Sequence, residues 1–253
     1  MVRLMARPLP FVLSAALGVL LSTSIAAPTP AAACDCGQGE PTVAEARARL
    51  ATIIEGRVVT IAPGAAGHDV TLFVLRAWKG ATAGTTITIA IDASSCGYAF
   101  VPGDEVLIYA PAGAPVEQCR GDQTARVRLG AGIAADAAAL GPPSSSAPLP
   151  APVATAPAAD IEIEGKVLVA PGGDRHLMTV EVTRGRRGAR KHERLTVVSP
   201  VGACAATTGA LAVGDRVTVT GRRVAALGPS TAVISGCDPA TRVRVTRSAR
   251  HVR

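Results

Sequence analysis

Aromatic residues, catalytic motifs and metal-binding motifs are scarce or missing in this 253-residue sequence. Phe, Trp and Tyr make up 2% of the residues, so Val, Ile, Leu and Ala must form most of any hydrophobic core. There is no nucleophile elbow, no His-Glu-x-x-His motif and no carboxylate pair at a suggestive spacing. The sequence therefore predicts a protein that is not an enzyme and that uses no catalytic residues, no cofactor and no metal ion.

Long apolar runs are also absent, except for one near the amino terminus. Arg3 and Arg7 precede an apolar stretch over residues 10–26, and residues 31–33 are the small alanines that a signal peptidase recognises. The stretch has the length of a signal sequence and is too short for a membrane span. We therefore predict a signal peptide over residues 1–33, a mature chain without a transmembrane span, and a secreted or periplasmic location.

All six cysteines lie beyond the predicted cleavage site. An even number in an exported chain favours disulfides over metal sites, and the sequence alone leaves their connectivity open. Cleavage after Ala33 makes Cys34 the first residue, with a free α-amino group. Lipid attachment to Cys34, as in bacterial lipoproteins, is an alternative that would block this amine. The predicted disulfide cysteines are Cys34, Cys36, Cys96, Cys119, Cys204 and Cys237.

Charge divides the mature chain into two halves. Residues 34–140 carry a net charge of −3, whereas residues 160–253 carry a net charge of +8. Residues 141–159 between them are rich in Pro, Ser and Ala and contain no charged residue, which is typical of a linker. We therefore predict two domains joined by this linker, and only the second is suited to an anionic partner.

The two halves also share a sequence pattern. Residues 54–59 (IEGRVV) match residues 163–168 (IEGKVL), and residues 70–74 (VTLFV) match residues 178–182 (MTVEV). Each half then contains a Gly-Asp pair, with one cysteine before it and one after it. This repetition predicts a duplicated module.

Within each module the apolar runs are short, β-branched and alternating, as in residues 86–91 and 216–220, which predicts strands. Helical patterns occupy residues 42–51 and 131–140, on either side of the first set of strands. About five strands in a segment of roughly 110 residues predict a Greek-key barrel of the oligonucleotide/oligosaccharide-binding (OB) kind, with a β-sandwich as the alternative. The predicted fold is therefore all-β, with two small OB-like barrels in tandem, the first with flanking helices.

The first half resembles a known family. Its order of motifs is Cys34-x-Cys36, a helix, IEGRV at residues 54–58, AWKG at residues 77–80, CGxxFxxG from Cys96, and Cys119 followed by Arg. This order is similar to that of netrin-like modules, and especially to the amino-terminal domain of tissue inhibitors of metalloproteinases and their bacterial relatives. The resemblance implies the disulfides Cys34–Cys96 and Cys36–Cys119, and with them Cys204–Cys237.

The resemblance also implies an activity. In that family the α-amine and the carbonyl of the first cysteine chelate the catalytic zinc of a metalloproteinase, and the next residue points into the specificity pocket of the protease. By this resemblance Cys34 chelates the zinc, Asp35 enters the pocket, and a metalloproteinase is the partner. Zinc accepts nitrogen and oxygen donors, and an α-amine with a pKa near ~7.7 is partly neutral at physiological pH. In the alternative interpretation, Cys34 and Cys36 are structural only.

The second half contains the densest basic stretch, on a predicted hairpin between two strands. This stretch predicts binding of an anionic polysaccharide, a lipid head group or an acidic protein, and a solvated loop is the alternative. Nucleic acid is not expected, because the chain is exported and no aromatic residue stands among the basic ones to stack on bases. The predicted anion-binding residues are Arg184, Arg186, Arg187, Arg190, Lys191 and Arg194.

Overall fold

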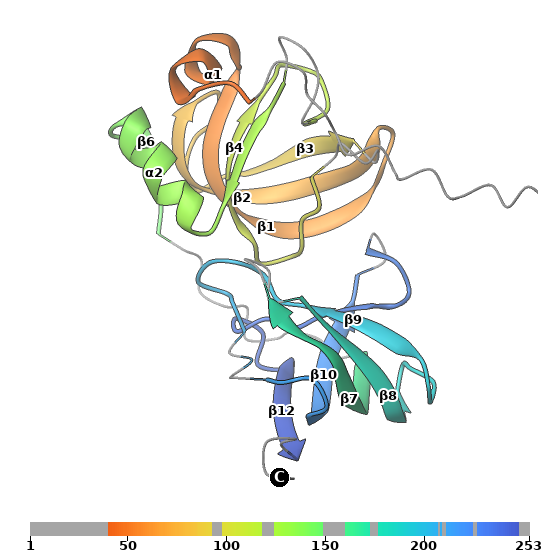
Figure 1. The fold of residues 1–253 in the computed structure, drawn as a ribbon. Helices are drawn as coiled ribbons and strands as arrows, with labels where there is room; N and C mark the ends of the chain where they lie inside the picture. The colour runs from red at the N-terminus through yellow and green to blue at the C-terminus, as the bar shows by residue number, and fades with distance from the viewer. Residues whose placement is uncertain are drawn as a thin grey trace, which may run out of the picture. The chain divides into compact units, whose positions relative to one another are not determined.

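Strands dominate the part of the chain that the computed structural model describes, and two helices accompany them. The strands form two separate sheets within one compact unit, Ala33–Arg253 (Figure 1). The predicted all-β class with barrels and flanking helices is therefore confirmed. The described residues are 40–92, 98–117, 124–148, 160–172, 177–206, 208, 211–224 and 227–247.

The first sheet curls around one hydrophobic core in the strand order β3-β2-β1-β4-β5. All neighbouring strands in this order are antiparallel, and β1 and β2 form a long, strongly curved hairpin (Figure 1). A parallel bridge between Ile91 and Val116 connects the β3 edge to the chain that follows β4. The strands are β1 (Thr52–Gly64), β2 (Gly67–Lys79), β3 (Thr86–Asp92), β4 (Glu105–Ala110), β5 (Arg126–Leu129) and the short β6 (Ser145–Ser146), which pairs with β2.

Two helices, α1 (Val43–Arg49) and α2 (Ala131–Leu140), stand where the sequence predicts them. Thr42 begins α1 with a capping box: its hydroxyl accepts the N–H of Glu45, and the Glu45 carboxylate accepts the N–H of Thr42 at 2.7 Å. The Thr42 hydroxyl also donates to this carboxylate at 2.8 Å, and the two hydrogen bonds that Thr42 donates lower the pKa of Glu45. Both helices contribute to a second, smaller core with β1 and β4, formed by buried Ala46, Leu50, Ile53, Leu107, Tyr109, Ile133 and Leu140.

An ion-pair network attaches α2 to β5. The Arg126 guanidinium donates to both oxygens of Asp136, at 2.6 and 2.8 Å, and to Glu40 at 3.1 Å. Arg128 also donates to Glu40, at 2.7 Å. Burial opposes ionisation of Asp136, but the hydrogen bonds and charge of Arg126, together with the charge of Arg128 and the Tyr109 hydroxyl, outweigh it and lower the pKa of this carboxyl group. The network therefore holds α2 and Glu40, in the segment that leads into α1, to the same strand.

The second sheet closes into a ring of five strands. Its order is β11-β9-β8-β7-β10-β12, and β11 also pairs with β10, which completes the ring β7-β8-β9-β11-β10. Short Val, Ile and Leu side chains fill its core, as expected from the scarcity of aromatic residues. The strands are β7 (Ile161–Gly172), β8 (Leu177–Arg187), β9 (Arg194–Val198), β10 (Arg216–Arg223), β11 (Thr231–Val233) and β12 (Arg242–Arg247).

The long hairpins β1–β2 and β7–β8 are irregular at equivalent positions. One register shift falls directly before Gly56 and another directly before Gly165, within the matching IEG segments. A Cβ atom at Gly56 would lie 2.9 Å from the Phe73 carbonyl oxygen, and one at Gly165 would lie 2.8 Å from the Glu181 carbonyl oxygen. Both bulges therefore need glycine. This shared geometry supports the duplication that the sequence predicts.

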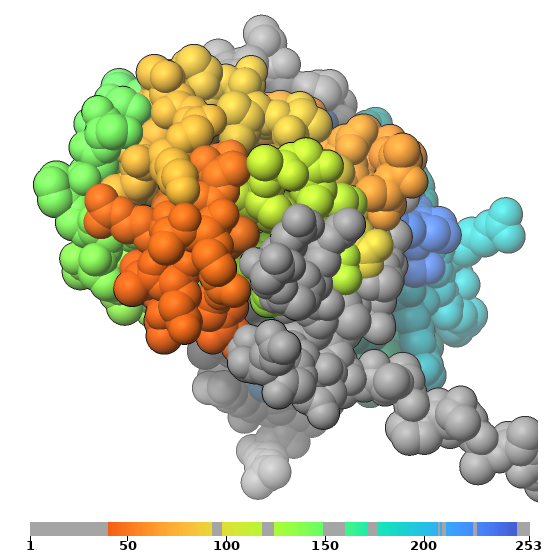
Figure 2. All heavy atoms as spheres, turned by 90° about the horizontal axis from the view of Figure 1, so that it is seen from above, coloured from red at the N-terminus to blue at the C-terminus, as the bar shows by residue number. Residues whose placement is uncertain are grey.

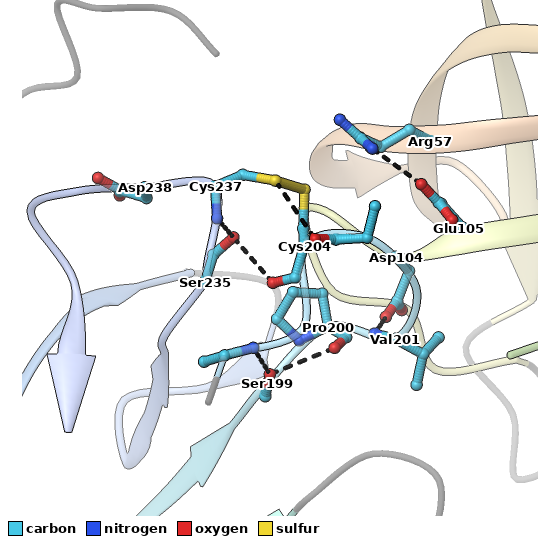
Figure 3. Close-up of a disulfide and its surroundings, with 12 residues drawn as sticks. Arg57, Asp104, Glu105, Ser199, Pro200, Val201, Cys204, Ser235, Cys237 and Asp238 are labelled. Carbon is cyan, nitrogen blue, oxygen red and sulfur yellow. Dashed lines mark hydrogen bonds and ion pairs between the residues drawn. A yellow bond between two sulfur atoms is a disulfide. The ribbon is translucent and has the colours of Figure 1, made fainter. Parts of the chain in front are cut away.

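The Gly-Asp turns before β4 and β10 are equivalent too. The buried Asp104 carboxylate accepts the N–H of Val101 at 2.8 Å, and Asp215 accepts the N–H of Ala212 at 2.8 Å. Asp104 also accepts the N–H of Val201 at 3.0 Å, a residue that follows β9 (Figure 3). A turn of the first sheet is thereby hydrogen-bonded to a segment of the second.

A disulfide joins Cys204 to Cys237, with their Cα atoms 4.9 Å apart (Figure 3). The Ser235 hydroxyl accepts the N–H of Cys237 at 3.2 Å and donates to the Cys204 carbonyl at 3.4 Å. The structure therefore contains the third predicted pair. The other four cysteines, Cys34, Cys36, Cys96 and Cys119, lie outside the described residues.

Other predictions about organisation meet the structure only in part. Within the predicted linker, Ser145 and Ser146 pair with Ala77 and Arg76 of β2, and residues 149–159 lie outside the described residues. The predicted signal peptide lies outside them as well. None of the helices in the described ranges has the length and apolar character needed to cross a membrane.

Candidate anion-binding surface

The outer surface of the second sheet is polar because its strands alternate. On β7, buried Ile161 and Ile163 alternate with the partly exposed Glu162 and Glu164. On β12, Val243 packs against the core whereas Arg242 and Arg244 are exposed. A strand period of two residues thus separates an apolar inner face from a charged outer face.

Strand register arranges the charged residues in two rows across β8, β7, β10 and β12. One row contains Arg184, Glu164, Thr218 and Arg244, which are successive partners in the ladders. The neighbouring row contains Arg187, Glu162, Thr220 and Arg242. Adjacent strands lie ~4.8 Å apart and the two rows ~7 Å apart, so these side chains share one continuous surface.

Arg186 neutralises part of this surface. Its guanidinium lies 2.6 Å from the Glu164 carboxylate and 3.4 Å from Glu162, and the hydrogen bond that Arg186 donates to Glu164 raises the pKa of Arg186. By contrast, Arg184, Arg242 and Arg244 form no ion pair with any residue in the described ranges. Their charges are therefore available to an external anion.

Positive charge predominates on this surface. Basic side chains outnumber the three carboxylates, Glu162, Glu164 and Glu181, on the outer face of the described strands. Such an excess creates a positive potential that attracts anions. We call this set the basic face: Lys166, Arg184, Arg186, Arg187, Arg194, Arg216, Arg242 and Arg244.

The structure brings four of the six predicted anion-binding residues onto the basic face. Arg184, Arg186 and Arg187 lie on β8 and Arg194 begins β9, and all four are exposed. Arg190 and Lys191 are exposed as well, but they lie in the turn between the two strands. The Arg190 main-chain N–H donates to the Glu193 carboxylate at 2.8 Å, which helps to fix this turn.

The sequence-based prediction missed four members of the basic face. Lys166, Arg216, Arg242 and Arg244 come from β7, β10 and β12, which are distant from the basic stretch along the chain. One local signal was present, because Arg242 and Arg244 alternate with valine and so share one side of a strand. Their position beside β10 depends on the sheet order, which the local sequence does not contain.

The basic face has no aromatic component. Residues 160–253 contain no Phe, Tyr or Trp, so no ring in this half can stack on a sugar or a base. Recognition by this surface must therefore rest on charge and hydrogen bonding. The planar arginine guanidinium is suited to both, because it forms charge-assisted hydrogen bonds with sulfate, phosphate and carboxylate groups.

The other predicted site is not described by the structure. Cys34 and Asp35, the residues implied to chelate and contact a protease zinc site, precede the first described residue, Glu40. The zinc-chelating interpretation therefore stays a prediction. Comparisons of the chain with protein-family models, with curated proteins and with solved structures found no match.

Proposed function

We propose that the protein is an exported, non-enzymatic binding protein whose second barrel binds an anionic polysaccharide through the basic face. The observation that carries the proposal is the cross-strand arrangement of Arg184, Arg242 and Arg244, three exposed cations without ion-pair partners among the described residues. The repeated charges of such a polymer can meet several of these arginines at once, so that weak individual contacts act together.

The composition of the second barrel favours a highly charged polymer over a neutral one. Neutral sugars are commonly held by aromatic rings, and this half of the chain has none. Charged polymers can instead be held by arginine alone, through charge-assisted hydrogen bonds to sulfate or carboxylate groups. The ligand class is therefore a polysaccharide with closely spaced anionic groups.

A lipid surface fits the basic face less well. Proteins that lie on membranes combine basic residues with apolar side chains that enter the lipid boundary. The large apolar residues with the highest exposure in the second barrel are Val169, Leu177, Val213 and Val245. None of them belongs to the two cross-strand rows of charged residues, so the rows lack the apolar part of a membrane-binding surface.

The test is to measure the affinity of the full mature chain for dextran sulfate over a range of salt concentrations. We expect saturable binding, no binding to uncharged dextran, and a logarithm of the binding constant that falls linearly with the logarithm of the salt concentration. Replacing Arg184, Arg242 and Arg244 together with glutamine should weaken binding and reduce the magnitude of the salt slope by up to ~3.

The matched control replaces three exposed basic residues of the first domain, Arg47, Arg49 and Lys79, with glutamine, which makes the same change in net charge. This variant should bind dextran sulfate nearly as tightly as the unaltered chain. Equal losses in the two triple variants would show that only net charge matters, and would refute the basic face as a site. Tighter binding to anionic lipid vesicles than to dextran sulfate would refute the polysaccharide as the ligand.

A further inference from the structure

Among its described residues, the first barrel has no counterpart of β11, the strand that closes the second barrel. In the second barrel, β11 runs parallel to β9 and pairs with it over Thr231–Val233. The Ser230 carbonyl accepts the N–H of Thr196 on β9, at 2.9 Å. In the first barrel, the parallel pairing at the corresponding edge is the single bridge between Ile91 and Val116. Strand β3 is consequently the terminal strand of its sheet.

Strand register identifies the equivalent positions in the two barrels. Thr71 of β2 pairs with Thr88 of β3, and Thr179 of β8 pairs with Thr196 of β9, within the matching segments of the repeat. The carbonyl of Ala90 points away from β2, since it accepts the N–H of Val116 at 2.8 Å. Thr88 stands two residues earlier, so its N–H and C=O point to the same open side. Thr88 therefore presents to solvent the groups that its counterpart, Thr196, uses to bind the closing strand.

The burial of neighbouring side chains shows what the missing strand would cover. Leu195 and Val197 of β9 are 0% and 1% exposed. Their counterparts on β3, Ile87 and Ile89, pack against the core of the first barrel but are only partly buried. An additional strand beside β3 would remove apolar surface of both isoleucines from water, which is a favourable change.

The chain after β4 leaves this edge open instead of closing it. Residues 112–115 are the counterparts of residues 230–233, because Val116 and Ile234 occupy equivalent places, each donating its N–H across the edge. Here Gly113 has a positive φ of 62°, and Pro115 has no N–H to donate. The segment therefore bends away from β3, and a groove of about 710 Å³ lies between them.

The groove is lined mainly by small apolar residues. One wall is formed by residues 87–90 of β3 and the other by residues 110–116 at and after the end of β4, and Asp69 is the only charged one among the described residues that line the groove. On the face shown in Figure 2, the lime residues at and after β4 lie beside both the first described residues (red-orange) and the yellow residues that follow β2. An extended chain with small or β-branched side chains suits such a groove.

We propose that this groove binds an extended peptide segment of a partner protein, which adds to the edge of β3 as a parallel strand. The chemistry of the occupant follows from β11 and the residue after it, Thr-Ala-Val-Ile, whose Ala232 and Ile234 are 0% and 1% exposed. The peptide presents small or β-branched residues to Ile87 and Ile89, and its main chain pairs with Thr88. A lysine or arginine in the peptide would complement Asp69. This site is separate from the basic face.

The test uses a fluorescent peptide with the sequence of residues 228–235 (GPSTAVIS) as the probe and the full mature chain as the receptor. We expect saturable binding by fluorescence anisotropy and slower hydrogen exchange of the Thr88 amide. Thr88→Pro removes this N–H at a position where an edge strand tolerates proline, and should weaken binding by about tenfold or more. Thr88→Val keeps the N–H and should bind the peptide as the unaltered chain does.

A second variant tests the groove without removing a hydrogen bond. Gly113→Thr together with Pro115→Val gives residues 113–115 the sequence of β11, Thr-Ala-Val. This variant should close the edge within its own chain, melt at a higher temperature and lose peptide binding. The proposal is overturned when the unaltered chain shows no saturable binding up to millimolar peptide, or when folded Thr88→Pro and the closed variant bind as tightly as the unaltered chain.

Discussion

We expect the two tyrosines to keep their phenolic protons well above the pH at which tyrosine normally ionises. Tyr98 and Tyr109 are the only tyrosines in the sequence; Tyr109 is buried in the smaller core of the first barrel, and Tyr98 is partly buried against the main core. Burial raises the pKa of Tyr98 from 10.0 to about 12, and the nearby Glu40 carboxylate adds to the effect. Burial, with Asp136 in addition, also raises the pKa of Tyr109.

The shift of Tyr98 has a calculable effect on stability. Below pH 10 the residue is protonated in both the folded and the unfolded chain. Between pH 10 and pH 12 the unfolded chain releases a proton that the folded chain retains, so rising pH favours unfolding. A difference of about two pKa units corresponds to about 3 kcal/mol. This contribution of Tyr98 to the free energy of unfolding is fully present below pH 10 and is lost as the pH approaches 12.

Ultraviolet absorbance of tyrosinate measures this directly. Native protein should show little tyrosinate at pH 11, whereas protein in urea should titrate near pH 10. The single tryptophan, Trp78, reports whether the first barrel is still folded, because its indole N–H donates to the Gly141 carbonyl at 2.8 Å. Tyr98→Phe should remove the lower of the two native transitions. Titration of both tyrosines near pH 10, with the Trp78 fluorescence still native, would refute the reasoning.

Two further predictions concern stability. Replacing Cys204 and Cys237 with serine opens a loop with a sequence separation of 33 residues. This should lower the free energy of unfolding, measured by urea denaturation, by about 4 kcal/mol. An unchanged free energy of unfolding would contradict this. Asp136→Asn removes the negative charge that pairs with Arg126. Because the Asp136 and Arg126 side chains are only 8% and 12% exposed, this change should lower the free energy of unfolding by about 3 kcal/mol. Arg186→Gln, which breaks the exposed pair with Glu164, should leave the melting temperature unchanged and serves as the control.

Local patterns in the sequence predicted the elements of this fold well. The helix over residues 131–140 has the predicted bounds, and α1 begins at the Thr42 capping box. The strand predicted over residues 86–91 and the one over residues 216–220 correspond to β3 and β10. These elements depend on periodicity and capping within a few residues, which a single sequence displays.

Features that depend on pairing between distant strands were not predicted. The basic stretch on β8 was visible in the sequence, but its extension to Arg242 and Arg244 requires β12 to lie beside β10. The open edge of β3 likewise depends on where residues 112–115 run, although Gly113 and Pro115 are residues that interrupt a strand. Local patterns do not encode which strands become neighbours, so surfaces that cross several strands are not visible from them.

The features that the two barrels share predict that the two proposed sites do not interfere with each other. The two barrels share a bulge before a glycine (Gly56, Gly165) and a turn held by an aspartate (Asp104, Asp215), so both keep the same curved arrangement of their central strands. The differences lie in the outward-facing residues and in the closing strand, which can change without disturbing that geometry. The groove uses residues of the first barrel alone and the basic face uses residues of the second alone. Peptide binding should therefore be unchanged by saturating dextran sulfate, since two ligands that share neither residues nor an alternative conformation have no coupling free energy.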